Sequence, residues 1–600
     1  MAAQEYIARN QTIMSELMVS RSERRRGLRL FAACALSLAL PLVGAEAPAG
    51  SAPTNSRPAS PPAPVAHNPE IEQLKAMLAE QQLQINELRG ELAKQKTTGS
   101  AAPSNAEASM DTAGRRPNLG EVASTTPIIP SGVNPSARVV NAAFAPAPAL
   151  VPQAPAPAGP PASETSPLQL KIGDATFTPV GFMDLTNTWR STNAGSSLQT
   201  NFGSFPYNNT VQGRLSEDKW SSENSRLGFR VDTKVRGANV LGYFEGDFVG
   251  LGNAANNTQV SSNSMLFRIR QYYVDVRKGF WEVLAGQAWS MIVPNRKGMS
   301  PLPADLFYSQ VVDVNYTNGL YWGRIPGIRI IGHPNNKVTF GFALENSAQY
   351  FGGSGGGGVP TLPAGLATTY NAEVDNSMNN DRTIPNVHPD ILGKLVIEPS
   401  NRFHFEIGGV ESTVKTFNPI TNKYFTKAGG AGTFAINAEI VKNFRVVTNN
   451  FWGDGAGRYL FGAVPNFIIR SDGSPSLMHA ASTLSGFEAT IKNIAPYIYY
   501  GGVYAARNTA LDANGTTRIG YGYTGSPNSQ NRSIQEVTAG LTHTLWKDAK
   551  YGALQYMVQY AYFFRNPWYV AANAPKNAHE SAVWFNLRYV LPGSAPTIKY

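Results

Sequence analysis

Apolar and polar residues alternate along two adjacent stretches of the chain, residues 226–232 and 240–248. The charged side chains on their polar faces are Arg226, Arg230, Asp232, Glu245 and Asp247. A period of two predicts β-strands with one apolar and one charged face. A soluble sandwich would turn the apolar face inward and would seldom repeat such hairpins from residue 168 to residue 592. The pattern therefore predicts a transmembrane β-barrel with its apolar side to lipid and its charged side to a water-filled lumen.

Strand-like segments continue to the end of this region, separated by alternating short and long connections. We count sixteen, at residues 176–191, 225–236, 238–249, 264–277, 280–290, 324–333, 337–346, 388–398, 402–415, 430–441, 443–453, 481–492, 494–507, 531–545, 549–566 and 578–592. Short turns face the periplasm in such barrels, and long loops face outward. The fold class is therefore all-β, an antiparallel transmembrane barrel of about sixteen strands. A long connection at residues 291–323 is a candidate to fold inward.

The first 45 residues have the features of a secretory signal peptide. A basic stretch at Arg21–Arg29 precedes the apolar stretch Leu30–Leu42, and small residues follow. We expect cleavage between Ala45 and Glu46, so that the mature chain is exported.

The segment between the signal peptide and the barrel divides into three parts. Residues 46–68 are a Pro/Ala-rich tether, residues 69–96 a periplasmic coiled coil, and residues 97–167 a disordered Pro/Ala-rich linker. The apolar heptad positions of the coiled coil are Ile71, Leu74, Leu78, Ile85, Leu88 and Leu92. This spacing predicts a bundle of two or three chains. Residues 593–600 form a C-terminal extension beyond the barrel at residues 168–592.

Composition excludes several other classes of protein. Hydrophobic residues make up 42% of the chain and aromatic residues 10%, with 56 glycines, and no run of eighteen apolar residues occurs outside the N-terminus. These values argue against a helical membrane protein and suit strands with aromatic girdles. The single cysteine, Cys34, lies in the signal peptide, so the mature chain has no cysteine-ligated metal. No Lys/Arg-rich run predicts a nucleic-acid partner, and no motif predicts a cofactor.

Four arginines occupy the polar faces of neighbouring strands: Arg226, Arg230, Arg268 and Arg270. Placing an arginine toward lipid at the middle of the bilayer costs about 2–4 kcal/mol, so these side chains should line the lumen. Glu245, Asp247 and Asp232 share the same face. Two interpretations are open and compatible: the charges brace the wall as ion pairs, or they orient and select solutes in a constriction.

Signals for catalysis or metal binding are weak. Gly352–Gly356 satisfies the G-x-S-x-G pattern but lies in a glycine-rich loop without the strand-turn-helix context of a nucleophile. His404 and Glu406 share a strand face without a third ligand nearby, which favours a lumen pair over a metal site. The acidic and amide residues of 375–381 form a weak calcium candidate. We therefore expect neither an enzyme nor a metalloprotein.

Four motifs resemble a known family. These are SRLGFR at Ser225–Arg230, YFEGDF at Tyr243–Phe248, RIRQYYVDV at Arg268–Val276 and AGQAWS at Ala285–Ser290. Together with the N-terminal coiled coil they resemble the DcaP-like trimeric outer-membrane porins. The resemblance implies a sixteen-stranded barrel, a homotrimer and diffusion of small, preferably anionic solutes past Arg226, Arg230, Arg268 and Arg270. The chain departs from the family in ending on Tyr600 after an extension.

The sequence thus predicts a porin of the bacterial outer membrane, with its N-terminal segment in the periplasm. Its partners would be outer-membrane lipid, two further copies of the chain, and small hydrophilic solutes such as carboxylates. The alternative is a structural protein that links the membrane to the cell wall through the coiled coil. Conductance across a planar bilayer separates the two functions.

Overall fold

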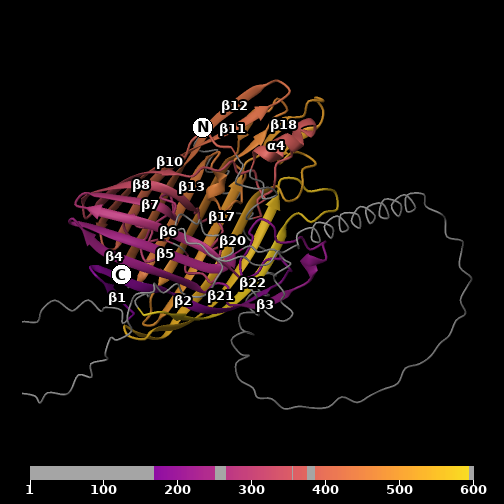
Figure 1. The fold of residues 1–600 in the computed structure, drawn as a ribbon. Coiled ribbons are helices and arrows are strands. Elements are labelled where there is room, and N and C mark those ends of the chain that lie inside the picture. Colours follow the sequence, from indigo (N-terminus) through magenta and orange to yellow (C-terminus); the bar gives the residue numbers. More distant parts are fainter. Residues whose placement is uncertain (1–167, 251–264, 308, 354–355, 375–384, 593–600) are drawn as a thin grey trace, which may run out of the picture. The chain divides into compact units, whose positions relative to one another are not determined.

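The computed structural model describes residues 168–592, apart from 251–264, 308, 354–355 and 375–384 (Figure 1). The predicted signal peptide, tether, coiled coil, linker and C-terminal extension lie outside the described residues. So do the predicted calcium candidate at residues 375–381 and Ser354 of the glycine-rich motif.

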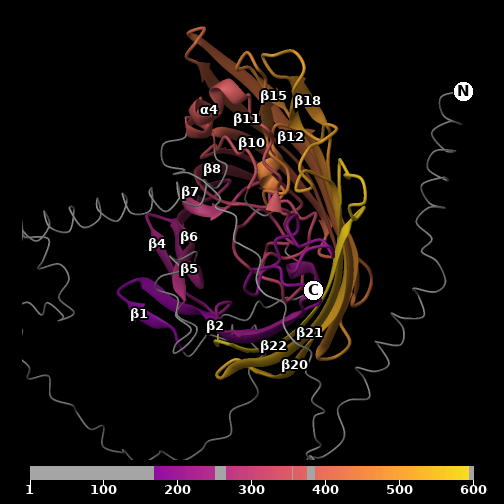
Figure 2. The same ribbon diagram turned by 90° about the vertical axis from the view of Figure 1, so that its right-hand side faces the viewer.

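The described residues form a closed, antiparallel barrel of sixteen strands, as the alternation in the sequence predicts. Figure 2 shows the ring of strands with coil segments inside it. The strands are β2 (Ala175–Arg190), β4 (Arg226–Val235), β5 (Ala238–Gly250), β6 (Leu266–Lys278), β7 (Trp281–Trp289), β8 (Arg324–Asn335), β9 (Val338–Glu345), β10 (Asp390–Ser400), β11 (Phe403–Asn418), β12 (Lys423–Val441), β13 (Phe444–Asp454), β16 (His479–Ala489), β17 (Ile494–Ala505), β20 (Asn531–Asp548), β21 (Gly552–Pro567) and β22 (Ala578–Val590).

The first and last barrel strands close the ring. β2 pairs with β22 from Phe182, opposite Val590, to Arg190, opposite Ala582. On its other edge β2 pairs with two strands in succession, because β3 (Glu217–Ser221) and β4 follow one another along it. The short strand β1 (Leu170–Ile172) adds to the beginning of β2. Because every barrel strand has a partner on both edges, backbone N–H and C=O groups are satisfied without water, as a bilayer requires.

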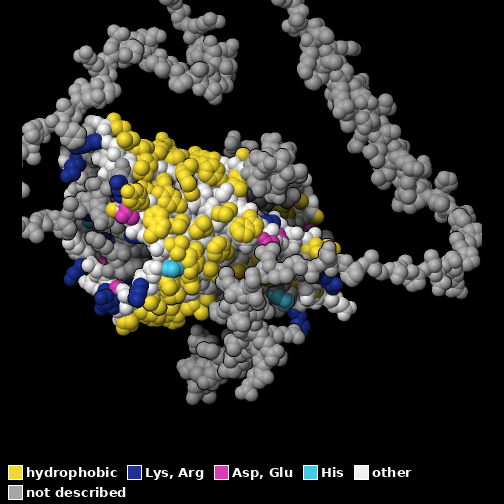
Figure 3. Space-filling model, turned by 90° about the horizontal axis from the view of Figure 1, so that it is seen from below, with side chains coloured by type: hydrophobic (Ala, Val, Ile, Leu, Met, Phe, Trp, Pro, Cys, Tyr) yellow, Lys and Arg dark blue, Asp and Glu magenta, His cyan; other side chains and the backbone are white. Residues whose placement is uncertain are grey.

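The two faces of the wall differ as the sequence pattern predicts. On β21 the apolar positions Val558, Tyr560 and Tyr562 are exposed, whereas Gln559 between them and Arg565 further along the strand are buried inside the barrel. In a soluble protein this distribution would be reversed. Figure 3 shows the resulting apolar surface over the strands. Such a band is the surface that a transmembrane barrel presents to lipid.

All sixteen predicted strands correspond to barrel strands, but the long connections contain more structure than their sequence indicated. β12 begins at Lys423, earlier than the expected residue 430, because its pairing with β11 continues through a polar hairpin to Asn418. Two small hairpins and one short helix also lie in the long connections: β14 (Phe467–Ile469) with β15 (Pro475–Leu477), β18 (Asn508–Leu511) with β19 (Arg518–Tyr521), and α4 (Ala367–Glu373). None of the described helices has the length and apolar character needed to cross a membrane.

Candidate functional site

The connection between β7 and β8, residues 290–323, folds into the barrel, and we call it the inner loop. It contributes apolar side chains to clusters that are completed by inward residues of the wall. Val312 and Tyr321, for example, are almost fully buried in a cluster that also contains Val410 and Phe451 of β11 and β13. A large part of the lumen is therefore filled by packed protein.

Polar contacts attach one end of the inner loop to β10 and β11. Lys394 donates hydrogen bonds to the carbonyl of Val293 (2.7 Å) and to Oδ1 of Asn295 (2.8 Å), and its Nζ lies 2.9 Å from Glu406. Glu406 also accepts the backbone N–H of Asn295 (3.1 Å) and contacts Nε2 of His404 (3.0 Å). The predicted His404–Glu406 pair therefore exists, and it takes part in holding the loop.

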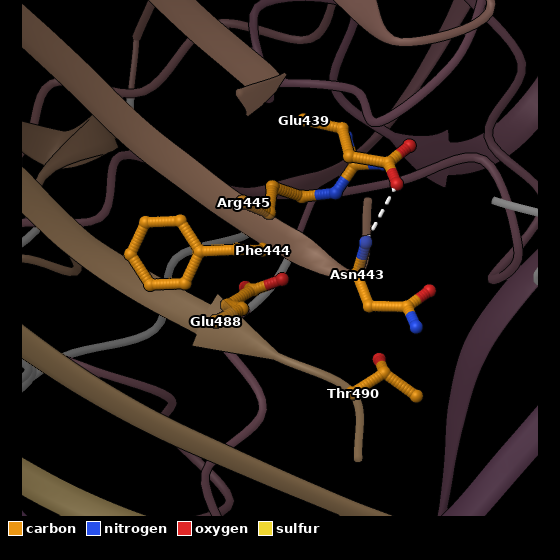
Figure 4. Close-up of a pocket in the computed structure, with 6 residues that line it drawn as sticks. All are labelled: Glu439, Asn443, Phe444, Arg445, Glu488 and Thr490. Atoms are coloured by element: carbon orange, nitrogen blue, oxygen red, sulfur yellow. Dashed lines mark hydrogen bonds between the residues drawn. The ribbon is translucent and has the colours of Figure 1, made fainter. Parts of the chain in front are cut away.

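The same end of the loop is also held on β16. Arg296 makes two hydrogen bonds of 2.8 Å to the carboxylate of Glu488, and both side chains are largely buried. Glu488 also lines a hollow beside the β12–β13 turn, together with Glu439 and Arg445 (Figure 4). The hollow has room for about 10 Å³, far less than the roughly 300 Å³ that a drug-sized solute needs.

The far part of the loop reaches the opposite wall. The backbone N–H of Asn318 donates to Glu536 of β20 (2.7 Å), and that of Val312 donates to Gln559 of β21 (2.5 Å). The inner loop thus contacts β10, β11, β16, β20 and β21. Charged side chains remain accessible on the arc of the wall that runs from β22 through β2 to β6. This arc carries most of the predicted lining residues.

Seven charged side chains lie along that arc, and we call them the charged wall. They are Asp184 on β2, Arg226 on β4, Glu245 and Asp247 on β5, Arg268 and Arg270 on β6, and Arg588 on β22. Their ion pairs form two groups, and the ring of Phe182 contacts a guanidinium of each group. The charged wall holds four arginines against three acids.

Arg270 is the centre of the charged wall. Its guanidinium lies 2.8 Å from Glu245 and 2.6 Å from Asp247, and its Nη2 donates to Tyr316 of the inner loop at 3.0 Å. Arg270 has no exposed surface, so it holds the loop and the two acids and offers nothing to solute. This placement agrees with the bracing interpretation for this one arginine.

Arg268 and Arg588 are placed differently, because each covers a buried acid. Arg268 pairs with Asp247 through two hydrogen bonds (3.0 and 2.8 Å), and its side chain is 32% exposed whereas that of Asp247 is 0% exposed. Arg588 lies 2.7 Å from Asp184, with 19% and 0% exposed. The surface that faces solvent is therefore guanidinium, and the compensating carboxylates lie behind it.

Arg226 belongs to the charged wall, and the predicted residues Arg230 and Asp232 lie beside it. Arg226 lies 3.9 Å from Glu245, and its guanidinium is 5.2 Å from the ring of Phe182. Arg230 pairs with Asp232 of its own strand at 2.6 Å, and both are more than one third exposed. A surface pair of this kind contributes little to stability.

The sequence analysis did not identify three charged residues of this region: Asp184, Arg588 and Arg324. The guanidinium of Arg324 lies between the rings of Trp289 (5.2 Å) and Trp322 (5.3 Å), without an ion pair to any described carboxylate. Asp184 and Arg588 stand at polar positions of alternating strands, so their facing could have been read from the pattern. Their contact could not, because 404 residues separate them.

The pKa of Tyr316 reports the electrostatic field at this place. Burial raises the pKa of this phenol, but Arg270, Arg226 and Arg324 lower it by more, so that it lies below its ordinary value. A phenol ionises more easily only where the local potential favours negative charge. The inner loop therefore meets the charged wall in a positive environment.

Among the described residues no group of three or more His, Cys, Asp or Glu side chains could hold a metal ion. No protein-family profile matches the chain, and no curated protein matches it either.

Solved structures do match. The outer membrane channel DcaP of Acinetobacter baumannii aligns with a TM-score of 0.52 and 14% identity, over 70% of this chain and 98% of that one. An anion-selective porin from Comamonas acidovorans aligns with a TM-score of 0.39 and 14% identity, over 69% and 99%. OmpF of Salmonella typhi aligns with a TM-score of 0.39 and 10% identity, over 70% and 100%. The resemblance to DcaP that the motifs indicated is thus present in the fold.

Proposed function

We propose that this chain is an outer-membrane porin that lets small hydrophilic solutes diffuse across the membrane and favours anions such as carboxylates. One observation carries the proposal: along the charged wall, exposed arginines cover buried acids. A passing solute meets the guanidinium groups of Arg268 and Arg588, while Asp247 and Asp184 stay behind them. Guanidinium groups recognise carboxylate in a bidentate manner.

The charge balance supports the same sign of selectivity. Four arginines against three acids leave an excess of one positive charge in the charged wall, and the unpaired Arg324 adds a second. In a narrow, partly desolvated lumen an uncompensated charge acts more strongly than in bulk water. Burial raises the pKa of Tyr316, and Arg270, Arg226 and Arg324 lower it by more.

The proposed role as a channel is inferred from the fold. One solved structure that shares this barrel is described as an outer membrane channel, and a barrel with an apolar exterior and a charged interior suits the same location. We propose that the predicted segment from residue 69 to residue 96 lies in the periplasm and that three copies assemble. Cross-linking of the purified protein, with and without residues 46–166, tests the trimer, which should persist in both because barrel walls make the main contact.

Selectivity is tested by the reversal potential of the purified protein in a planar bilayer under a KCl gradient. We expect conductance and anion preference in the wild type. The double variant Arg268→Gln with Arg588→Gln should move the reversal potential toward cations, while Asp247 keeps Arg270 as a partner and Asp184 keeps Asn586. Lys423→Gln with Lys427→Gln, in the hairpin of β11 and β12, is the matched control.

Two results would contradict the proposal in different ways. A protein that is folded, as judged by its strand-rich circular dichroism, but does not conduct would favour the structural role through the coiled coil. A protein that conducts and prefers cations, or whose reversal potential ignores the double substitution, would retain the channel but remove the anion preference.

A further inference from the structure

The short turns of the barrel share an exposed basic side chain. Seven turns join the strand pairs β4–β5, β6–β7, β8–β9, β10–β11, β12–β13, β16–β17 and β20–β21 at one end of the barrel. Each holds an exposed lysine or arginine within the turn or at the strand end beside it. We call these side chains the basic rim: Arg236, Lys278, Lys337, Arg402, Lys442, Lys492 and Lys550.

Nearby charges strengthen this ring more than they offset it. Lys234, Arg277 and Lys547 are exposed at the same strand ends. Asp174 and Asp548 are exposed there too, and the carboxylate of Asp548 is engaged in accepting the backbone N–H groups of the β20–β21 turn. Opposed by so few acids, the rim generates a positive potential along the whole circumference.

Most of the rim cations are free to meet a partner. Among the described residues, only Arg402 of the basic rim has a carboxylate within 4 Å, that of Glu439 at 3.9 Å. In Figure 3 dark blue side chains border the yellow apolar band, most of them at one end of it. If the lysines served only to keep the turns soluble, they would not be needed at every turn, and they would not have to lack acidic partners.

Exposed aromatic rings fix the level of the rim relative to a membrane. Phe280 and Trp281 lie beside Lys278, and both contact Phe340 of the next hairpin, with ring centroids 5.9 and 6.2 Å away. These rings are about half exposed on the outside of the barrel. On the opposite side, Lys550 lies 5.2 Å from the ring of Tyr551. Aromatic side chains at a barrel's edge mark the boundary between acyl chains and headgroups.

The rim cations therefore stand at the height of lipid phosphates, and Lys278 continues the lipid-facing positions Tyr272, Val274 and Val276 of β6. We propose that the basic rim binds the phosphate groups of anionic phospholipids in the leaflet that the short turns face. Lysine ammonium groups suit this partner, because they act as point charges toward phosphate without demanding a fixed geometry. Each barrel would then carry a belt of anionic lipid that ties its short-turn end to that leaflet.

The test uses the folded, full-length protein in detergent micelles. Dioleoyl phosphatidylglycerol or dioleoyl phosphatidylcholine is titrated in, and bound lipids are counted by native mass spectrometry. We expect about fivefold preference for the anionic lipid at low salt, as a basic surface near a membrane provides, and its loss as ionic strength rises. A variant with glutamine at Lys278, Lys337, Lys442 and Lys492 should lose most of the preference.

Controls separate the lipid from other anions. The variant Lys423→Gln with Lys427→Gln changes two exposed cations on the hairpin at the other end of the barrel and should keep the preference. If glycerol 3-phosphate displaces the anionic lipid at equal concentration, the rim takes free phosphate and the proposal fails. It also fails if wild type and rim variant bind the two lipids alike, or if the rim substitutions instead reduce binding to isolated peptidoglycan.

None of these results depends on conduction. A protein that is not a channel can still bind anionic lipid at its rim, and an anion-selective channel can lack this preference. The outcome is therefore distinguishable from the outcome of the reversal-potential experiment.

Discussion

Arg296 of the inner loop and Glu488 of β16 are joined by two parallel hydrogen bonds of 2.8 Å in a largely buried setting. Paired guanidinium and carboxylate of this geometry are among the strongest polar contacts in proteins. Because 192 residues separate the two, the contact fixes a long connection to a distant strand. The inner loop is thus built as a stationary part of the lumen.

Breaking this contact should loosen the loop. In Arg296→Gln the buried carboxylate of Glu488 loses its charged partner, which costs roughly 3 kcal/mol of local stability, while Tyr499 still donates to it at 2.7 Å. We expect a larger and noisier single-channel conductance, recorded in a planar bilayer. Lys297→Gln, the exposed neighbour, is the control and should conduct as the wild type does. Identical recordings for both variants would mean that the loop position does not depend on Arg296.

A second substitution tests the same loop from the wall. Gly501 of β17 lies directly under the inner loop, and a methyl group at this position would overlap the carbonyl oxygen of Asn318. Gly501→Ala should therefore push the loop away from the wall and speed the entry of uncharged sugars into proteoliposomes. At Gly393, on β10, an added methyl group meets open space, so Gly393→Ala is the control. Unchanged sugar entry in Gly501→Ala would place the loop elsewhere.

The strands, their number and their facing could be predicted from the sequence because each rests on local alternation. A residue such as Arg268 follows a period of two whatever lies across the lumen, and an arginine facing lipid is costly. The role of Arg270 could not be predicted. It differs from Arg268 in pairing with Glu245 as well as Asp247 and in being covered by Tyr316, which lies 46 residues further along the chain.

The long connections were the least predictable part for the same reason. Residues 290–323 show no periodicity, and their conformation is dictated by partners such as Lys394, Glu536 and Gln559 on distant strands. Asp184 and Arg588 were visible as polar positions, but only barrel closure brings the first and last strands together. Long-range pairs of this kind leave no local signal.

Because Arg270 is buried, substituting it tests how much this side chain contributes to the stability of the barrel wall. Replacing it by methionine leaves Glu245 and Asp247 buried without their shared partner, which should destabilise the barrel by about 3–5 kcal/mol. The measurement is the temperature at which the compact, heat-modifiable band disappears on a gel. Arg230→Gln removes an exposed pair and should cost less than about 1 kcal/mol.

A rescue distinguishes charge from packing in this variant. Adding Glu245→Gln to Arg270→Met removes the carboxylate whose closest ion pair was with Arg270, while Asp247 keeps Arg268, so part of the lost thermal stability should return. A double variant that is no more stable than Arg270→Met would show that the guanidinium is needed for its shape and its hydrogen bond to Tyr316.

The last prediction concerns pH and follows from Tyr316, whose pKa lies below the ordinary phenol value of 10.0. Burial raises that pKa, and the nearby arginines lower it by more. An acid with a lowered pKa ionises earlier as pH rises, and the phenolate adds a negative charge beside Arg270. Anion preference should therefore decline as pH is raised from neutrality toward 10.0, as measured by the reversal potential in a fixed KCl gradient. Tyr316→Phe cannot ionise, and because lysines titrate alike in both proteins, the difference between the two curves isolates Tyr316. Coincident curves would mean that the phenol stays neutral and that the arginines do not set the potential at the inner loop.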